Sequence, residues 1–457
     1  MPAHANGDEL GRCAMQPDKL QSNILKSHNR KHVVLLPLRF TAPADKIREW
    51  ISAFSRQHVT SASQQGKEID HFRQTRQDAG SVLGNFYISP FGYTALGLDP
   101  EQLDSELFPD VQVTFSKGMA AYAGELNDPP QIDWEESYRD RIDAMILLAA
   151  NDAGNLLAEC ANVLLGLQKM AVAEPRTIEV GKALFNESGQ RIEHFGFVDG
   201  ISDPHFTEVD PAGGTRQQWD PRADVDLVLA KDPFAPEPDC WGSFLVYRKL
   251  EQDVKKFKDL VRNLARQLTN GDEMFAKAMV VGRFPNGSPL VLSGRDDHPG
   301  TNDFDYRDDR DGSRCPFHSH IRKMTPRGGS DRPLEEERSS RIARRGITYG
   351  RRSPRLDDEP EAGVGTLFLC FQHNISRQFA FLQKRWANRL EFPRQGVGID
   401  PFSGRVAAAA SQQWPTAWDQ PGRVGFDLSR VVTLKGGEFF FAPSLPFLRN
   451  LGATPDT

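Results

Sequence analysis

The sequence has few cysteines, and they form no motif. Cys13, Cys160, Cys240, Cys315 and Cys370 are odd in number and scattered, without a Cys-x-x-Cys pair. This usage is typical of reduced thiols in a cytoplasmic protein. Because no Cys-x-x-Cys-His occurs, covalent attachment of a c-type haem is excluded.

Long apolar runs, an export signal and a strong net charge are also lacking. The best apolar run, Ala144 to Ala150, is far too short for a membrane span. The first twenty residues carry Asp8 and Glu9 but neither an apolar core nor a twin arginine, so no export signal is visible and a cytoplasmic location is expected. The net charge of −6 gives no sign of nucleic-acid binding.

The composition that remains is that of a soluble globular protein. With 39% apolar and 26% charged residues, the 457-residue chain can bury a large core and is too long for one small domain. Residues 1–17 are polar and expected to be disordered. Two charged loops, 293–314 and 351–363, are expected at the surface.

Apolar periodicity predicts two strand–helix units in each half of the chain. The expected strands are 33–40, 144–150, 243–250 and 366–371, and the helices that follow carry apolar faces at 47–54, 155–170, 254–268 and 375–386. Pro37 indicates that the first strand is an edge or contains a bulge. This plan favours two α+β halves over one doubly wound sheet, with a boundary in the proline-rich stretch 211–239.

One stretch with chemical potential is Gly196-Phe197-Val198-Asp199-Gly200-Ile201-Ser202-Asp203-Pro204. The glycines allow backbone angles closed to other residues, and Pro204 ends any regular element. Apolar Phe197 and Ile201 flank Asp199, an environment that can tune a carboxyl for proton transfer. The residues alone fit an ordinary Asp-Gly turn equally well.

A second stretch, Cys315 to Arg327, holds His318 and His320. Two histidines and a cysteine this close could bind zinc, although no fourth ligand lies nearby. One imidazole in an apolar pocket would suffice to ligate haem iron. From the residues alone, surface or core histidines rank first, a metal site second and a haem ligand third.

Both stretches resemble the motifs of one family. Gly-Phe-x-Asp-Gly-Ile-Ser-x-Pro resembles the signature of the dye-decolourising peroxidases, which are haem enzymes, and Cys-Pro-x-x-x-His-Ile-Arg-Lys-x-x-Pro-Arg resembles their proximal segment. The length resembles the longer bacterial and fungal branch. The resemblance implies an α+β fold of two ferredoxin-like halves of the dimeric α+β barrel type. Residues 18–225 would form the first half, and residues 226–457 the haem-binding second half.

The resemblance also assigns the principal site residues. It makes His320, rather than His318, the axial ligand of the haem iron, and it places Arg327 against a haem propionate. Asp199 is the implied acid–base group and Arg344 the distal arginine, which leaves Arg341 and Arg345 as exposed charges. Threonine at 325 and at 348 departs from the family's usual asparagine and proline.

Further roles implied by the resemblance concern the surroundings of the haem. Gly200, Ile201 and Phe368 would contact the cofactor, Phe368 from the distal side. Asp400 would accept the other ring N–H of the ligand, which would make the imidazole more basic. Tyr349, five residues after Arg344, is a hypothetical radical relay.

The implied function is a peroxidase with one non-covalent haem b per chain. It would reduce hydrogen peroxide and oxidise bulky aromatic or phenolic compounds and dyes in one-electron steps. Its partners would be peroxide and aromatic reductants, with no nucleic acid and no membrane, in a monomer or homodimer. The alternatives are a haem-handling protein of the same fold with little turnover, and a cofactor-free interaction protein.

Overall fold

The computed structural model describes residues 15–206, 208–209, 219–353, 355–405, 412–428 and 430–452. Most of the N-terminal segment predicted to be disordered, and part of the predicted boundary 211–239, lie outside these residues. Residues 15–17 are described and lead into the fold through a turn.

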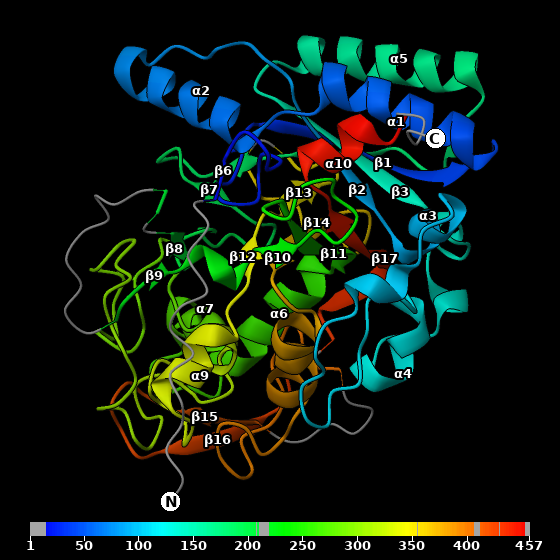
Figure 1. The fold of residues 1–457 in the computed structure, drawn as a ribbon. Helices are drawn as coiled ribbons and strands as arrows, with labels where there is room; N and C mark the ends of the chain where they lie inside the picture. Colours follow the sequence, from blue (N-terminus) through cyan, green and yellow to red (C-terminus); the bar gives the residue numbers. More distant parts are fainter. Residues whose placement is uncertain are drawn as a thin grey trace, which may run out of the picture.

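The first half of the chain builds a four-stranded antiparallel sheet. Its elements in chain order are β1 (His32–Phe40), α1 (Ala44–His58), β2 (Leu83–Ile88), β3 (Ala144–Ala150), α5 (Ala153–Met170) and β5 (Glu179–Lys182). The strands lie in the order β2-β3-β1-β5, which is the ferredoxin-like order. Helices α1 and α5 lie together over the first-half strands at the top of Figure 1.

The second half repeats this order. Its strands are β11 (Trp241–Gln252), β13 (Ile347–Tyr349), β14 (Gly365–Gln372) and β17 (Val432–Ala442), and they lie in the order β17-β11-β14-β13. Helix α6 (Val254–Ala265) follows β11 directly. The helix expected after β14 forms as two π-helical turns, η6 (Ser376–Ala380) and η7 (Leu382–Ala387).

The two sheets join edge to edge into a closed ring. Strand β17 meets β2 at Phe441 and Ile88, and β5 meets β13 at Gly181 and Tyr349. Because β11 also pairs with β14, the path β11-β17-β2-β3-β1-β5-β13-β14 returns to its start. The predicted α+β fold of two ferredoxin-like halves is thereby confirmed, and alternate side chains of each strand fill the inside of a barrel.

The remaining elements, apart from the 14-residue helix α2, are short. The helices are α2 (Ala62–Thr75), α3 (Pro90–Ala95), α4 (Ala123–Leu126), α7 (Glu273–Val281), α8 (His320–Met324), α9 (Leu334–Ser339) and α10 (Leu445–Asn450). The strands are β4 (Ala173–Pro175), β6 (Leu184–Phe185), β7 (Arg191–Ile192), β8 (His205–Phe206), β9 (Arg222–Ala223), β10 (Ala230–Lys231), β12 (Ala343–Arg344), β15 (Gln412–Pro415) and β16 (Arg423–Phe426).

Strand β1 is not an edge strand, contrary to one expectation from Pro37. It pairs with β3 along one side and with β5 and then β4 along the other. Pairing with β5 ends at Leu35 and pairing with β4 begins at Leu38, and the partner chain has one extra residue across this gap. Pro37, which has no N–H to donate, lies in that irregularity, and its carbonyl accepts from the Arg176 N–H at 2.7 Å.

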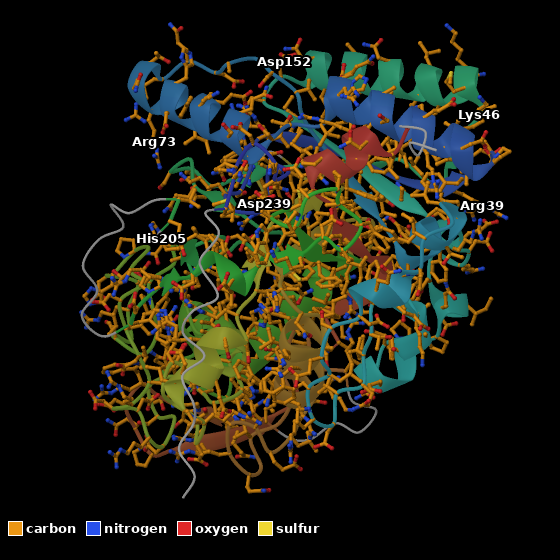
Figure 2. The ribbon with its side chains drawn as sticks, in the orientation of Figure 1. Arg39, Lys46, Arg73, Asp152, His205 and Asp239 are labelled. Carbon is orange, nitrogen blue, oxygen red and sulfur yellow. The ribbon has the colours of Figure 1, made fainter. Side chains whose placement is uncertain are left out.

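The outer surface is charged. Arg39, Lys46, Arg73 and Asp152 are exposed and extend from the first half (Figure 2). Among the described residues, no helix has the length and apolar character needed to cross a membrane. Cys160, Cys240, Cys315 and Cys370 are buried and unpaired, and Cys13 lies outside the described residues.

Candidate active site

Asp199 is held on a turn between two glycines in left-handed conformations. Gly196 has φ +95° and Gly200 φ +85°, angles that a residue with a side chain rarely adopts. The Asp199 N–H donates to the Arg191 carbonyl at 3.1 Å, and Asp199 Oδ1 accepts from the Gly200 N–H at 2.7 Å. The carboxyl is nevertheless 47% exposed, so it is oriented by the turn and remains accessible.

Arg344 faces this carboxyl from the two-residue strand β12. Its Nη1 lies 3.3 Å from Asp199 Oδ1, and its Nε lies 3.4 Å from Oδ1 of Asp203. Burial alone would lower the pKa of Arg344, but the carboxylates of Asp203 and Asp199 raise it overall. The site therefore contains a fixed cation between two acids.

Asp203 is an acid that the sequence motif contains but to which no role was assigned. Burial raises its pKa above the usual value, and Arg344 and Arg345 act in the opposite direction. Asp199, Asp203 and Arg344 all line a cavity of about 430 Å³ together with Gly200 and Thr366. Arg73 and His205, labelled in Figure 2, also line it.

Arg341 and Arg345 are not the exposed charges that were expected. Arg345 is buried, and its guanidinium donates to the carbonyls of Asn23 at 2.8 Å, Ile24 at 2.9 Å and Arg344 at 2.7 Å. Arg341 donates to three further carbonyls, and burial lowers its pKa to about 10. Both arginines tie separate segments together, whereas Arg344 is the one that faces Asp199.

His320 begins helix α8, and its ring is oriented by a carboxylate. Nδ1 of His320 lies 2.8 Å from Oδ2 of Asp400, so Nε2 is the nitrogen left for a metal. The other oxygen of Asp400 accepts from the N–H groups of Phe402 at 2.9 Å and Ser403 at 2.6 Å. Burial would raise the pKa of Asp400, but His320 and these hydrogen bonds hold it below the usual range.

His318 lies in the core, not at the surface. It is 2% exposed, its ring packs edge-on against Trp414 at 4.2 Å, and burial lowers its pKa to about 3. Cys315, His318 and His320 do not converge on one point. Within the described residues, the one group of three side chains of metal-ligand type consists of Glu237, Asp239 and Cys240, elsewhere in the chain.

Two buried arginines form a cradle beside the Asp199 loop. Arg327 donates to Oδ1 of Asn302 at 2.7 Å and to the Asn302 carbonyl at 2.8 Å, and Arg283 donates to the same Oδ1 at 3.0 Å. Both also reach Oγ of Ser202 at 3.4 Å. The hydrogen-bond acceptors of these two cations in the described structure are backbone carbonyls and the side chains of Asn302 and Ser202, all uncharged. Burial lowers the pKa of Arg283 to about 10 and of Arg327 to about 9, so a buried anion would be favoured here.

The loop of Asp199 therefore connects the two predicted sides of the site. Ser202 contacts Arg327, which follows the His320 helix in the chain. The ring of Phe402 joins them a second time, since it lies 5.3 Å from the His320 ring and stacks on Phe195 at 5.3 Å. His320 and Asp199 thus belong to one packed region, although they are 121 residues apart in the sequence.

The remaining predicted residues lie as follows. Phe368 is half-buried on β14, on the same sheet face as Cys370, the residue that pairs with Arg344. Ile201 packs closely against Gly287. A Cβ added at Gly287 would lie 2.5 Å from Cδ1 of Ile201. Gly200 lines the cavity with Asp199.

Tyr349 points into the barrel beside a polar cluster. Its ring lies 5.2 Å from Nζ of Lys249, and among the described residues its buried hydroxyl has no hydrogen-bond partner. Nearby, the Tyr138 hydroxyl bonds the Tyr247 hydroxyl at 2.7 Å and Glu179 Oε1 at 2.9 Å. Lys249 donates to the same Glu179 oxygen at 2.8 Å.

Reasoning from the sequence missed several residues of this region. Asp203 stands inside the Gly196–Pro204 stretch, so its position was visible and only its contacts were not, whereas Arg283 lies outside both stretches. Asn302 lies in the 293–314 stretch that was expected to be a solvated loop, yet Phe304, Tyr306 and Asp309 in that stretch are buried. No periodic pattern marks this irregular segment, and therefore nothing in the sequence indicated its burial.

The arrangement fits a haem on several independent grounds. His320 offers one ring nitrogen whose partner nitrogen is held by a carboxylate, as metal-bound histidines usually are. Arg283 and Arg327 offer two buried cations to acidic groups of a ligand. His320, Arg344 and Asp199 keep side-chain exposures of 30%, 36% and 47% although they sit among buried residues.

Comparison with known proteins gives a consistent result. Residues 191–392 match the family described as Dyp-type peroxidase, C-terminal. The chain is 38% identical to the multifunctional dye peroxidase DyP2 of Amycolatopsis sp., over 96% of this chain and 97% of that protein. It is 29% identical to the dye-decolorizing peroxidase msp1 of Mycetinis scorodonius, over 80% and 76% of the two chains.

Solved structures agree with the sequence matches. The crystal structure of a DyP-type peroxidase from Anabaena sp. superimposes with a TM-score of 0.88 at 40% identity, covering 95% of this chain and 94% of that one. DyP2 from Amycolatopsis sp. superimposes with a TM-score of 0.86 at 36% identity, over 97% and 98% of the two chains. The chain therefore belongs to the dye-decolourising, DyP-type peroxidase family.

Proposed function

We propose that this protein is a haem peroxidase that reduces hydrogen peroxide and oxidises bulky aromatic compounds, phenols and dyes in one-electron steps. The observation that carries the proposal is the pairing of Arg344 with Asp199 in the cavity, in a chain that matches a dye peroxidase over nearly its whole length. A pair of this kind can move a proton and stabilise negative charge at one place.

The cofactor in this proposal is one non-covalent haem b per chain. When bound, the haem group would supply two electrons to peroxide, one of them from its iron, and a reductant would return them singly. His320 would ligate the iron through Nε2, and Arg327 with Arg283 would hold the haem carboxylates. Phe368, Ile201 and Gly200 would contact the ring. Asp400 would keep the imidazole oriented and electron-rich.

Asp199 and Arg344 have different roles in the reaction with peroxide. Asp199 accepts a proton from one peroxide oxygen and returns it to the other, which leaves as water. Arg344 stabilises the negative charge that develops as the O–O bond breaks, and its planar guanidinium keeps a fixed direction better than a lysine would. The contact of Arg344 with Asp203 supports this orientation.

Tyr349 would carry oxidising equivalents to dyes too large for the cavity. Because its side chain is buried on β13, Tyr349 would be an internal step of this path and not the place that a dye contacts. The Tyr349 hydroxyl has no acceptor among the described residues, and the Glu179 carboxylate, which accepts from Tyr138 and Lys249, would be the base of this cluster that takes up the phenolic proton. The division of the chain at residue 225, the cytoplasmic location and a monomeric or dimeric state remain predictions.

The direct test is to reconstitute the purified chain with haem and to record its absorption spectrum and its peroxide-dependent oxidation of a bulky dye. The proposal expects a Soret band and saturable turnover. A haem-handling protein would show the band without turnover, and a cofactor-free interaction protein would show neither, so either result would contradict the proposal. The relatives that match over most of this chain are named peroxidases, which does not favour these alternatives.

A further inference from the structure

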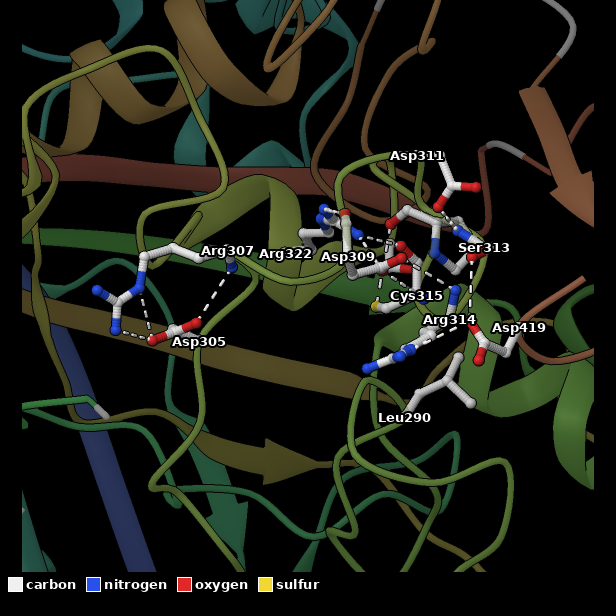
Figure 3. Close-up of polar contacts among 12 residues, drawn as sticks. Leu290, Asp305, Arg307, Asp309, Asp311, Ser313, Arg314, Cys315, Arg322 and Asp419 are labelled. Atoms are coloured by element: carbon white, nitrogen blue, oxygen red, sulfur yellow. Dashed lines mark hydrogen bonds and ion pairs between the residues drawn. The ribbon is translucent and has the colours of Figure 1, made fainter. Parts of the chain in front are cut away.

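Helix α8 is only five residues long, and three of its side chains make separate buried connections. His320 bonds Asp400. Arg322 extends to the preceding loop, where it donates to Asp309 Oδ2 at 2.5 Å, to the Asp309 carbonyl at 2.6 Å and to the Cys315 carbonyl. Figure 3 shows Arg322, Asp309 and Cys315 together, with Asp309 also accepting from the Cys315 N–H at 2.9 Å. Arg322 therefore fixes the start of the helix.

Lys323 makes the third connection, to the loop that leads to Asp400. Its side chain is fully buried, and Nζ donates to the carbonyls of Arg389 at 2.8 Å, Gly398 at 2.7 Å and Phe392. An ammonium has three N–H donors, and here each has one backbone acceptor. All three acceptors belong to the ten-residue stretch 389–398, so one side chain bonds both ends of this loop and a residue between them.

The 389–398 loop leads to Asp400. Gly398, which accepts from Lys323, is two residues before the aspartate and has φ +95°. The Asp400 N–H in turn donates to the Ala387 carbonyl at 2.9 Å. Since His320 and Lys323 stand three residues apart on the same helix, the position of Asp400 relative to His320 is set by the two side chains of one short rigid element.

We propose that Lys323 is a positioning residue that holds Asp400 in hydrogen-bond contact with His320 and thereby sets the electron donation of the haem ligand. Its Nζ donates to backbone carbonyls of the 389–398 loop, and it acts on Asp400 through that loop. The proposal rests on haem ligation by His320, as given under the proposed function. A residue of purely structural importance would affect stability without changing the electronic character of the ligand.

The reduction potential of the haem iron separates positioning from a direct charge effect, because the two have opposite signs. If Lys323→Met loosens Asp400, the imidazole becomes less basic, the ferric state is less stabilised and the midpoint potential rises. If Lys323 acts only as a nearby positive charge, its removal favours the ferric state and the potential falls. A rise is therefore expected, of the same sign as that in Asp400→Asn and smaller than it.

A double-mutant cycle tests whether the effect passes through Asp400. In an Asp400→Asn background, Lys323→Met should cause no further rise. The control is Lys384→Met on η7, which also removes a lysine that donates to a backbone carbonyl, that of Asp110 at 2.6 Å, together with its ion pair to Glu125 at 2.7 Å, but leaves the 389–398 loop untouched. This control should leave the potential unchanged.

Lys323→Gln provides the variant that keeps a buried donor group if Lys323→Met does not fold. Its amide can donate to two of the three carbonyls, so an intermediate rise is expected. An unchanged or lowered potential in a folded Lys323 variant, or an equal rise with and without Asp400, would overturn the positioning role while haem ligation stands. Failure of the wild-type chain to bind haem would instead overturn the proposed function.

Discussion

Nη1 of Arg344 lies 3.3 Å from Oδ1 of Asp199, and this contact joins the loop after β7 to the strand β12 across 145 residues of sequence. The distance is long for a charge-assisted hydrogen bond, and both side chains remain partly exposed. The pair is thus spaced so that a small substrate can reach both groups. Two expectations for the reaction with peroxide follow from this geometry.

Replacing Asp199 by asparagine keeps the size of the side chain and removes the base. We expect the bimolecular reaction with peroxide, measured by stopped-flow absorbance, to slow by about 10²- to 10⁴-fold, because general acid–base catalysis typically accelerates a reaction by that factor. The haem spectrum should hardly change. Asp203→Asn leaves Asp199 in place and should slow the reaction less. Wild-type rates in Asp199→Asn would mean that Arg344 suffices and that Asp199 only shapes the turn.

Arg344 and its neighbour Arg345 should respond in opposite ways to substitution. Arg344→Leu removes a preorganised donor and should slow the peroxide reaction by about 10²- to 10³-fold with little loss of stability. Arg345→Met removes three buried hydrogen bonds and should lower the free energy of unfolding by about 3 kcal/mol. Urea titration and stopped-flow kinetics measure the two effects. A large rate loss in a stable Arg345 variant would move the distal role to that residue.

These adjacent arginines also show what the sequence could and could not indicate. The motif selects Arg344, but its neighbour looked like a surface charge because a two-residue strand gives no periodic pattern. Both guanidinium groups lie within 4 Å of Asp203, but Arg344 also reaches Asp199, whereas Arg345 donates to the carbonyls of Asn23 and Ile24. Those carbonyls come from a segment more than 300 residues away, and no local rule connects them.

The fold itself was largely predictable, because each half repeats a strand–helix pattern with clear apolar periodicity. The closure of the barrel was not derivable from that pattern, since it depends on single pairings such as Phe441 with Ile88. Likewise His320 could be chosen over His318 only by resemblance. The structure supplies the physical difference, which is a carboxylate beside one ring and an indole beside the other.

The arginine cradle predicts a change in haem affinity. Arg327→Met or Arg283→Met should weaken haem binding by about 10- to 100-fold, since a hydrogen bond to a charged group is worth about 1.5–3 kcal/mol. Haem transfer to an excess of apomyoglobin gives the dissociation rate. Arg48→Met is the control, because Arg48 also donates to a carbonyl, that of Leu96, but lies on α1. Equal rates of haem dissociation in all three variants and the wild type would show that Arg283 and Arg327 do not hold the haem.

The buried histidine His28 predicts acid sensitivity of the first half. Burial, together with Arg191, Arg30 and Arg345, lowers its pKa to about 3. Because the unfolded chain binds this proton near pH 6.5 and the folded chain does not, the stabilisation is present above pH 6.5 and is lost as the pH falls toward 3. The loss from this group should reach about 3 kcal/mol near pH 4.5, because each pH unit below 6.5 costs about 1.4 kcal/mol.

His28→Asn keeps an acceptor for the Arg30 N–H, which His28 Nδ1 now accepts at 2.9 Å, and removes the titration. Its unfolding free energy, measured by urea titration at several pH values, should therefore depend less on pH between 6.5 and 4.5 than that of the wild type. Identical slopes in the two proteins would show that His28 does not contribute to acid unfolding.

The most direct test of the whole account is the absorption spectrum of His320→Ala after haem reconstitution, compared with that of His318→Leu. His320→Ala should lose the Soret band of the ligated haem and regain it when imidazole is added. His318→Leu fills the place against Trp414 with an apolar side chain and should keep the wild-type spectrum. A wild-type band in His320→Ala, with loss of the band in His318→Leu, would contradict the assignment of the iron ligand and the site built around it.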